Sequence, residues 1–518
     1  MQELPIGVQS FEMLRRDGLL YVDKTLRLFE LIDNGRRYFL SRPRRFGKSL
    51  TLSTLDAMFS GKADLFVGLS AEKWVRTQFC SPLPVLRFDI SARELSTPTL
   101  LYKSLKSMIN RSAKKFGVEI FSDTLSDMFG ELIEGLYHTR GSVVVLIDEY
   151  DKPILDNITN ISQADAMRKV LKDFYATLKS YDDCLRFVFI TGISKFSKVG
   201  VFSALNNLED ISMDEQFADI AGYTQQEIEY FFGDRIKATA EKMKLTSEKL
   251  LELLREYYDG FCFDGKLKLY NPFSIMQCLK KREFGNYWYE SGSPSFIVKW
   301  MREHKIQEPE EYRHKVVKKD FASSQEIERA EPSSFLFQSG YLTIEDKQEQ
   351  LLTLDYPNRE VMDSISSMYL ELIYKVDSYA LLGNEIWKAL RGEDISEVVR
   401  LYNVALHGIA YDDYVKNRNE FWYRSMFVML LRGAGIIAYN EPHTSKGRAD
   451  VVLQFQNLFV VLEFKFAEKS SKVEEKKIEG QLQIADRGYS KNYGTEGHKV
   501  ITAVLVADDE KHQVFLYL

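Results

Sequence analysis

The chain has 518 residues, too many for a single hydrophobic core, and this length predicts about three domains. Its hydrophobic content of 45% and charged content of 28% are typical of a globular protein. The formal net charge of −6 excludes a strongly basic nucleic-acid-binding protein, so any such binding requires a local basic surface.

The four cysteines form no C-x-x-C pair, and the seven histidines form no H-x-H or H-E-x-x-H cluster. We therefore expect no disulfide framework and no zinc site, and we expect the protein to occupy a reducing compartment. The first ten residues, MQELPIGVQS, do not resemble a signal peptide, and no apolar run approaches ~18 residues. These patterns predict a soluble cytoplasmic protein without a membrane partner.

The segment YFLSRPRRFGKSLT predicts a phosphate-binding loop. A short apolar strand, Tyr38 to Ser41, precedes a GKS tripeptide and a helix-spaced stretch, LTLSTLDAMF. Backbone N–H groups at a helix N-terminus bind phosphate, the loop lysine neutralises the β- and γ-phosphates, and the adjacent serine hydroxyl binds Mg²⁺. The predicted nucleotide-binding residues are Arg45, Phe46, Gly47, Lys48, Ser49 and Leu50. Arg42 stands where the first glycine of G-x4-G-K-S belongs, and the alternative is a chance tripeptide.

A second motif, SVVVLIDEYDKPILD, begins with an apolar run from Ser142 to Ile147 that predicts a central parallel strand. Asp148 and Glu149 follow at its carboxyl end, where α/β sheets bind their ligands. We expect Asp148 to hold Mg²⁺ through its water shell and Glu149 to polarise the attacking water. The alternative is an acidic pair that only caps a helix or forms salt bridges.

Another apolar strand, Leu185 to Ile190, ends in Thr191 and Gly192. Thr191 is our candidate for sensing the γ-phosphate, and a simple turn is the alternative. A strand at 83–90 and helices near 98–116, 122–138 and 163–180 complete the pattern. Together these elements predict a parallel sheet with helices on both faces over residues 1–235.

Residues 236–380 predict a helical, winged-helix-like region. We expect Asn271-Pro272 to end one helical element, and the runs Tyr341–Ile344 and Leu351–Leu354 to form a hairpin. The hairpin turn is acidic, with Glu345, Asp346 and Glu349 beside a single lysine, Lys347. This charge favours a contact with another domain over a contact with DNA. A helical linker is expected over 381–412.

Residues 413–518 predict an α/β domain with the order helix, three strands, helix, strand. The first helix begins at Glu420 and ends at Gly433 and Gly435. The later elements are the strands IIAYN, GRADVVLQF and LFVVLEFKF, a helix near 473–488 and the strand KVITAVLVAD.

Strand periodicity places Glu463 and Lys465 on one face of LFVVLEFKF. Asp450 begins the neighbouring strand, at a separation that lets a hairpin bring it beside Glu463. Two close carboxylates repel each other, and a divalent cation relieves that repulsion. Mg²⁺ held there can activate water against a phosphodiester, with Lys465 holding or deprotonating that water. The alternative is an exposed Glu–Lys pair on an edge strand.

The blocks RPRRFGKSL, LIDEYDKPI, FVFITGISKFSKVGVFSALNNLEDIS, YYDGFCF and YNPFSI resemble the AAA-ATPase-like family found in bacteria with a C-terminal PD-(D/E)XK nuclease-like domain. The family's loop also reads R-P-R-R-F-G-K-S. The resemblance implies a STAND-like signalling ATPase that uses ATP and Mg²⁺. It matches the Asp450…Glu463-x-Lys465 signature and implies that Glu420 completes the metal shell. Gln483 and Tyr489 match the Q-I…Y pattern of the nuclease half.

These patterns favour an ATP-regulated, Mg²⁺-dependent DNA endonuclease. The alternative is a nucleotide-binding switch whose C-terminal domain recognises nucleic acid or protein without cutting. No arginine finger can be assigned from the sequence: Arg44 and Arg45 are candidates in cis, and a neighbouring subunit of a homo-oligomer is the other source.

Overall fold

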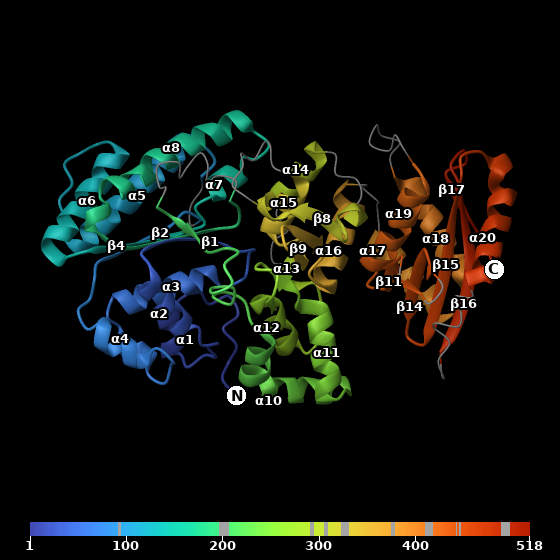
Figure 1. The fold of residues 1–518 in the computed structure, drawn as a ribbon, viewed down its shortest axis with the longest axis horizontal. Coiled ribbons are helices and arrows are strands. Elements are labelled where there is room, and N and C mark those ends of the chain that lie inside the picture. The colour runs from blue at the N-terminus through green and yellow to red at the C-terminus, as the bar shows by residue number, and fades with distance from the viewer. Residues whose placement is uncertain are drawn as a thin grey trace. The chain divides into compact units, whose positions relative to one another are not determined.

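The computed structural model describes residues 1–91, 95–195, 207–290, 295–304, 309–322, 331–373, 379–409, 418–441, 443–444, 447–487 and 498–518 (Figure 1). The chain forms two compact units. Unit 1 comprises Met1–Trp300 and Tyr312–Glu360, and unit 2 comprises Met301–Glu311 and Val361–Leu518. The finer division predicted from the sequence, at 235, 380 and 412, stays a prediction.

Unit 1 is built on a five-stranded sheet of order β2-β3-β4-β1-β5, in which every neighbouring pair is parallel. The strands are β1 (Arg37–Ser41), β2 (Val85–Asp89), β3 (Val143–Asp148), β4 (Leu185–Gly192) and β5 (Glu209–Asp210). Alternate residues of β3 enter different cores: Val143 and Val145 pack on one face, and Val144 and Leu146 on the other. The apolar run that predicted β3 therefore reflects burial on both sides.

Helices cover both faces of this sheet, which confirms the predicted fold of the N-terminal region (Figure 1). One face carries α5 (Pro98–Phe116), α6 (Leu125–Arg140) and α8 (Ile161–Ser180). The other carries α1 (Phe11–Arg16), α2 (Thr25–Asn34), α3 (Lys48–Phe59) and α4 (Glu72–Gln78). Short elements at Ala63–Phe66, Lys152–Leu155 (α7) and Asp182–Cys184 connect them.

The rest of unit 1 is the helical, winged-helix-like region. Its first helices are α10 (Gln225–Met243), α11 (Ser247–Tyr258), α12 (Pro272–Lys281), α13 (Tyr287–Glu290) and α14 (Ser295–Glu303), with a hairpin of β6 (Phe261–Cys262) and β7 (Lys268–Leu269). The end of α14 and most of the turn Pro309–Tyr312 belong to unit 2, which includes Met301–Glu311. Unit 1 continues with a turn at Lys319–Ala322, α15 (Pro332–Ser339) and an antiparallel sheet. This sheet contains β8 (Lys315–Lys318), β10 (Leu351–Asp355) and β9 (Thr343–Gln348) in that order.

Two details of this region refine the sequence analysis. Asn271-Pro272 starts a helix instead of ending one, because the Asn271 side chain accepts hydrogen bonds from the first-turn N–H groups of Phe273 (3.0 Å) and Ser274 (3.2 Å). The acidic hairpin packs within unit 1, where the Lys347 ammonium lies 3.1 Å from a Glu215 carboxylate oxygen.

Unit 2 contains a mixed sheet of order β11-β14-β15-β16-β17. The strands are β11 (Ile437–Asn440), β14 (Val451–Phe455), β15 (Leu458–Ala467), β16 (Lys499–Asp508) and β17 (Gln513–Tyr517). A separate two-stranded sheet contains β12 (His443–Thr444) and β13 (Gly447–Arg448). The main helices are α19 (Glu420–Gly433) and α20 (Val473–Arg487), with a short turn at Ser470–Lys472. The predicted restriction-endonuclease-like α/β order is confirmed, and β17 is an additional strand that the sequence did not indicate.

Three further helices precede the sheet: α16 (Arg359–Met368, extended by Tyr369–Ile373), α17 (Tyr379–Arg391) and α18 (Ile395–Gly408). The last of these is more than a connector. The Asn403 side chain of α18 exchanges two hydrogen bonds of 2.8 Å with the backbone of Val514 on β17, and the Tyr402 hydroxyl donates to the carbonyl of Tyr423 at 2.6 Å. Much of the expected linker thus packs into unit 2.

Within the described residues, every helix is too short or too polar to serve as a membrane span.

Candidate functional sites

A cavity of about 390 Å³ lies where β1 leads into α3 in unit 1. Its charged and polar wall carries seven residues that the sequence analysis named: Arg44, Arg45, Gly47, Lys48, Ser49, Leu50 and Glu149. Gly47 immediately precedes α3 with φ of 94°, a left-handed conformation that glycine adopts without strain. This glycine lets the chain turn from the loop into the helix at the cavity wall.

The start of α3 faces this cavity with hydrogen-bond donors. The first bonded amide is that of Thr51, which donates to the Gly47 carbonyl at 2.9 Å. The preceding N–H groups of Lys48, Ser49 and Leu50 have no acceptor within the helix, because the first turn of any helix lacks one. These donors and the positive end of the helix dipole make the position suitable for an anion.

The Lys48 side chain folds back over its own loop. Its ammonium donates to the carbonyls of Arg42 at 2.8 Å and Pro43 at 3.0 Å. Burial lowers the pKa of this ammonium, while the nearby carboxylates of Glu149 and Asp148 act in the opposite direction. The loop therefore already holds the lysine at the cavity, opposite the acidic end of β3.

Arg42, which replaces the first glycine of the general motif, has a structural role here. Its buried guanidinium donates to the carbonyls of Ser212 at 2.6 Å and Ala218 at 3.2 Å, and it lies 4.2 Å from the centre of the Phe263 ring. These contacts tie the loop to two segments that follow the sheet. The substitution is therefore compatible with an ordered loop.

Phe46 differs from its neighbours in the predicted nucleotide-binding set. Its buried ring packs edge-on against Phe261 (4.9 Å between ring centres) and Phe263 (5.7 Å), and its carbonyl accepts from Gly222 N at 3.1 Å. The side chain thus anchors the loop. Any contact of Phe46 with a nucleotide would come from its backbone.

The acidic end of β3 faces the same cavity. Glu149 lines the cavity with φ of 51°, and burial raises the pKa of its carboxyl while the Lys48 ammonium opposes that rise. Asp148 is buried and accepts a hydrogen bond of 2.7 Å from the Thr191 hydroxyl. Thr191 itself is fully buried and does not line the cavity, and its expected contact with the γ-phosphate stays a prediction.

The sequence analysis missed Asp151, which is completely buried next to this edge. Its carboxylate accepts from the amide of Ile193 (3.0 Å) and from the amide (2.7 Å) and hydroxyl (2.8 Å) of Ser194. Burial raises the pKa of this carboxyl, and the Ser194 donors oppose the rise. The third acid in the DEYD string was the available signal. Asp151 fixes the chain just after β4.

The remaining cavity wall is largely apolar, and no spacing in the sequence connects its parts. It combines residues from the N-terminal segment, from α12 and α13 and from the segments just before α10 and just after α15: Pro5, Val8, Tyr223, Pro272, Phe273, Met276, Trp288 and Tyr341. The Trp288 indole donates to the Arg44 carbonyl at 3.2 Å, and the Arg45 guanidinium lies 4.9 Å from the Phe273 ring centre.

A second cluster of charges lies in unit 2, on β14 and β15. The antiparallel register pairs Val451 with Leu462, so Asp450 precedes β14 directly opposite Glu463. The Asp450 carboxylate accepts from the amide of Phe464 at 2.7 Å, which fixes it against β15. The structure thus brings together the two carboxylates that the hairpin length predicted as neighbours.

Glu463 and Lys465 share a face of β15, as strand periodicity requires, and both are buried. The Lys465 ammonium lies 2.8 Å from a Glu463 carboxylate oxygen. Burial and the Asp450 charge raise the pKa of the Glu463 carboxyl, and Lys465 opposes the rise. A buried carboxylate is costly unless it is paired, and Lys465 supplies one counter-charge in this cluster.

Glu420 begins α19, where Asn419 caps the helix by accepting from Trp422 N at 2.9 Å. Burial raises the pKa of the Glu420 carboxyl; Lys465 lowers it and Asp450 raises it further. All four predicted residues of this centre therefore interact. Gln483 lies half-buried on α20, and Tyr489 lies outside the described residues.

Arg424 is the residue of this centre that the sequence analysis missed. It follows Glu420 by one helical turn, and its side chain is only 7% exposed. One guanidinium nitrogen lies 3.2 Å from Asp450 and another 2.6 Å from Glu441. The i, i+4 spacing from Glu420 was the only signal in the sequence. Arg424 partly neutralises Asp450 in the structure.

Comparison with known proteins finds a family model over each of the two regions that contain these sites. Residues 5–202 match a family model described as predicted AAA-ATPase, and residues 418–515 match the PD-(D/E)XK nuclease superfamily. The chain is 33% identical over 513 residues to an "Uncharacterized protein in vnfD 5'region" of Azotobacter chroococcum mcd 1, covering 96% of this chain and 95% of the relative. The chain belongs to this AAA-ATPase-like family with a C-terminal PD-(D/E)XK domain.

Solved structures resemble this AAA-ATPase-like protein only distantly. The Aeropyrum pernix ORC1 protein in complex with DNA gives a TM-score of 0.27 at 11% identity, over 66% of this chain and 92% of the other. The Aeropyrum pernix ORC2 protein, in ADPNP-ADP complexes, gives a TM-score of 0.30 at 12% identity, over 84% and 88%. Scores this low carry no functional argument.

Proposed function

We propose that the protein binds and hydrolyses ATP, and that its nucleotide state regulates a Mg²⁺-dependent nuclease-like domain that acts on DNA. The observation that carries this proposal is that each unit concentrates opposed charges at one place. Unit 1 sets Lys48 against Glu149 across a cavity, and unit 2 sets the neighbouring carboxylates of Asp450 and Glu463 beside Lys465.

In unit 1 the residues around the cavity suit a nucleoside triphosphate. Lys48 and the free amides at the start of α3 would hold the phosphates, and the apolar wall at Pro272 and Phe273 would hold the base. Glu149 faces the cavity and would orient and deprotonate the attacking water. Ser49 and Asp148, the latter positioned by the Thr191 hydroxyl, are the candidate Mg²⁺ ligands.

In unit 2 the carboxylates of Asp450, Glu463 and Glu420 suit a hard divalent cation. Burial and the Asp450 charge raise the pKa values of Glu463 and Glu420, and a bound cation would relieve both effects. A bound Mg²⁺ would supply charge stabilisation at a phosphodiester and lower the pKa of a water molecule. Lys465 would hold that water or remove its proton. Arg424 would neutralise Asp450 until a cation binds.

A second candidate function is supported by one observation. Lys465 and Arg424 already provide counter-charges to Glu463 and Asp450. A centre neutralised by its own side chains suits a domain that recognises nucleic acid or protein without cleavage. In that case the protein would be a STAND-like nucleotide switch.

Two substitutions separate these functions when each is measured for ATP hydrolysis and for nicking of supercoiled DNA with Mg²⁺ or Mn²⁺. We expect Lys48→Ala to abolish ATP binding and hydrolysis, because it removes the side chain assigned to neutralise the β- and γ-phosphates. We expect Glu463→Ala to abolish nicking while ATP hydrolysis continues. If the wild-type protein hydrolyses ATP yet never nicks DNA, the switch is correct. If Lys48→Ala hydrolyses ATP normally, the nucleotide-site assignment is wrong.

A further inference from the structure

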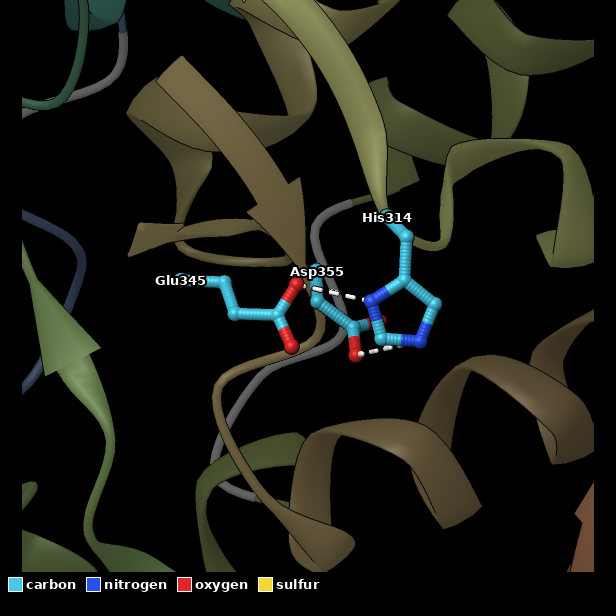
Figure 2. A group of neighbouring side chains, drawn as sticks. All are labelled: His314, Glu345 and Asp355. Atoms are coloured by element: carbon cyan, nitrogen blue, oxygen red, sulfur yellow. Dashed lines mark hydrogen bonds and ion pairs between the residues drawn. The ribbon is translucent and has the colours of Figure 1, made fainter. Parts of the chain in front are cut away.

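A separate group of side chains of metal-ligating type lies on the three-stranded sheet of unit 1, and none of its members lines the cavity described above. Figure 2 shows His314, Glu345 and Asp355, with dashed lines from the imidazole ring to each of the two carboxylates. The three residues come from three adjacent positions in the sheet: just before β8, on β9 and at the end of β10. One ligand atom from each lies within 4.8 Å of the others.

The backbone aims these side chains at one another. The β10–β9 register shifts between Thr353 and Leu354: Leu354 pairs with Ile344, whereas Thr353 pairs with Asp346. Glu345 is therefore the extra residue of a bulge, and such bulges redirect a side chain. On the other side, the β10–β8 register pairs Leu354 with Lys315, which places His314 opposite Asp355.

The imidazole is oriented as a metal-ligating histidine usually is. Its Nδ1 lies 2.7 Å from a Glu345 carboxylate oxygen, and its Nε2 lies 3.8 Å from Asp355 Oδ2. A carboxylate that accepts the Nδ1 proton leaves the Nε2 lone pair directed at the second carboxylate. A separation of 3.8 Å between nitrogen and oxygen is compatible with one ion that binds each at about 2.0–2.2 Å.

The Asp355 carboxylate is held in place by hydrogen bonds, and one of its oxygens still has a lone pair that can bind a metal ion. Its Oδ1 accepts from Arg313 Nε at 3.1 Å and from Tyr356 N at 2.8 Å, which uses both lone pairs of that oxygen. Its Oδ2 accepts from a terminal Arg313 nitrogen at 3.1 Å. The oxygen with remaining capacity is thus the one that faces His314.

We propose that His314 and Asp355 bind a transition-metal dication such as Zn²⁺, that Glu345 orients the histidine or joins as a third ligand, and that water completes the shell. An imidazole ligand favours such a metal over Mg²⁺ or Ca²⁺. The side chains of His314 and Glu345 are 59% and 39% exposed, so ions and water can reach them. The bound ion would tie β8, β9 and β10 together.

The proposal does not rest on the proposed function, and no sequence pattern indicates this site. His314 and Glu345 are 31 positions apart, so no short ligand motif exists, and only the sheet register assembles the site. The expectation of no zinc site came from cysteine and histidine spacing alone.

The test is calorimetric titration of the full-length protein with Zn²⁺ in the presence of excess Mg²⁺, comparing variants. His314→Asn removes the imidazole but keeps a residue that tolerates the backbone φ of 49°. Glu345→Gln keeps the shape and one acceptor oxygen. His407→Asn is the matched control, because His407 is another exposed histidine and contacts only the Asn403 carbonyl of its own helix in the contacts described.

We expect His314→Asn to bind one Zn²⁺ fewer per chain than wild type and Glu345→Gln to weaken that site about tenfold. His407→Asn should match wild type. The same Zn²⁺ should raise the melting temperature of wild type but not of His314→Asn. If wild type and His314→Asn bind the same number of Zn²⁺ ions with the same affinities, the proposal is wrong, whatever the outcome of the ATPase and nicking assays.

Discussion

Replacing Lys465 with methionine tests the electrostatics of the nuclease-like centre without any assumption about substrate. The substitution keeps much of the side-chain volume and removes the charge. It leaves Glu463, whose side chain is 0% exposed, without the ammonium that lies 2.8 Å away. Asp450 on the neighbouring strand adds repulsion. We expect Lys465→Met to destabilise unit 2.

The size of the effect follows from burial. Exposed ion pairs contribute about 0–1 kcal/mol, but removing one partner of a buried pair costs about 3–5 kcal/mol. Protonation of Glu463 limits this cost. Taking up a proton from the ordinary pKa of 4.5 costs about 1.4 kcal/mol per pH unit, hence at most about 5 kcal/mol at pH 8 and about 2 kcal/mol at pH 6. The loss relative to wild type is smaller than these limits, because burial already raises the pKa of Glu463 with Lys465 present. Because the pKa of Glu463 is raised in the folded state, its contribution to the free energy of unfolding is greatest at low pH and is lost as the pH rises through that folded-state pKa.

Scanning calorimetry of the full chain at pH 6 and pH 8 measures this loss of stability in unit 2. Lys465→Met should lower the transition of unit 2 strongly at pH 8 and much less at pH 6. Addition of Glu463→Gln should restore most of the loss, and Mn²⁺ should stabilise Lys465→Met more than the double variant. An equal loss at both pH values, or no loss, would refute this account of the pair.

Three further substitutions test individual roles. Glu149→Gln should bind ATP normally in equilibrium titration but hydrolyse it at least about 100-fold more slowly, and a normal rate would show that Glu149 does not activate water. Thr191→Val removes the hydroxyl that positions Asp148, so the hydrolysis rate should fall about tenfold with little change in ATP affinity. A large change in affinity instead would place Thr191 at the nucleotide. Arg424→Met removes a cation from Asp450 and should tighten Mn²⁺ binding about tenfold by calorimetry, whereas weaker binding would mean that Arg424 only holds Asp450 in position.

Local patterns predicted much of the fold. The apolar run at β3 could be assigned as a central strand because burial on both faces removes the usual alternation. The spacing from Asp450 to Glu463 could be used because a short hairpin leaves few alternative registers. The P-loop and nuclease-like centres both depend on such short-range relations.

Contacts between distant segments could not be predicted in the same way. Arg42 stands at a glycine position, and nothing near it in the sequence indicates that Ser212 and Ala218 will accept its hydrogen bonds. Thr191 could be placed at a strand end, but whether it faces the cavity or Asp148 depends on side-chain packing. Arg424 depends on β11 and β14, which bring Glu441 and Asp450 to it from different strands.

Control of the chemistry in unit 2 by nucleotide bound in unit 1 is the part of the proposed function that links the two units. It is tested most directly by the rate at which purified full-length protein nicks supercoiled DNA with Mn²⁺, measured without nucleotide, with ATP and with a non-hydrolysable ATP analogue. The account predicts a metal-dependent rate that changes at least about tenfold with nucleotide, a response that Lys48→Ala loses. A nicking rate that is the same with and without nucleotide, or no nicking under any of the three conditions, would contradict this regulation.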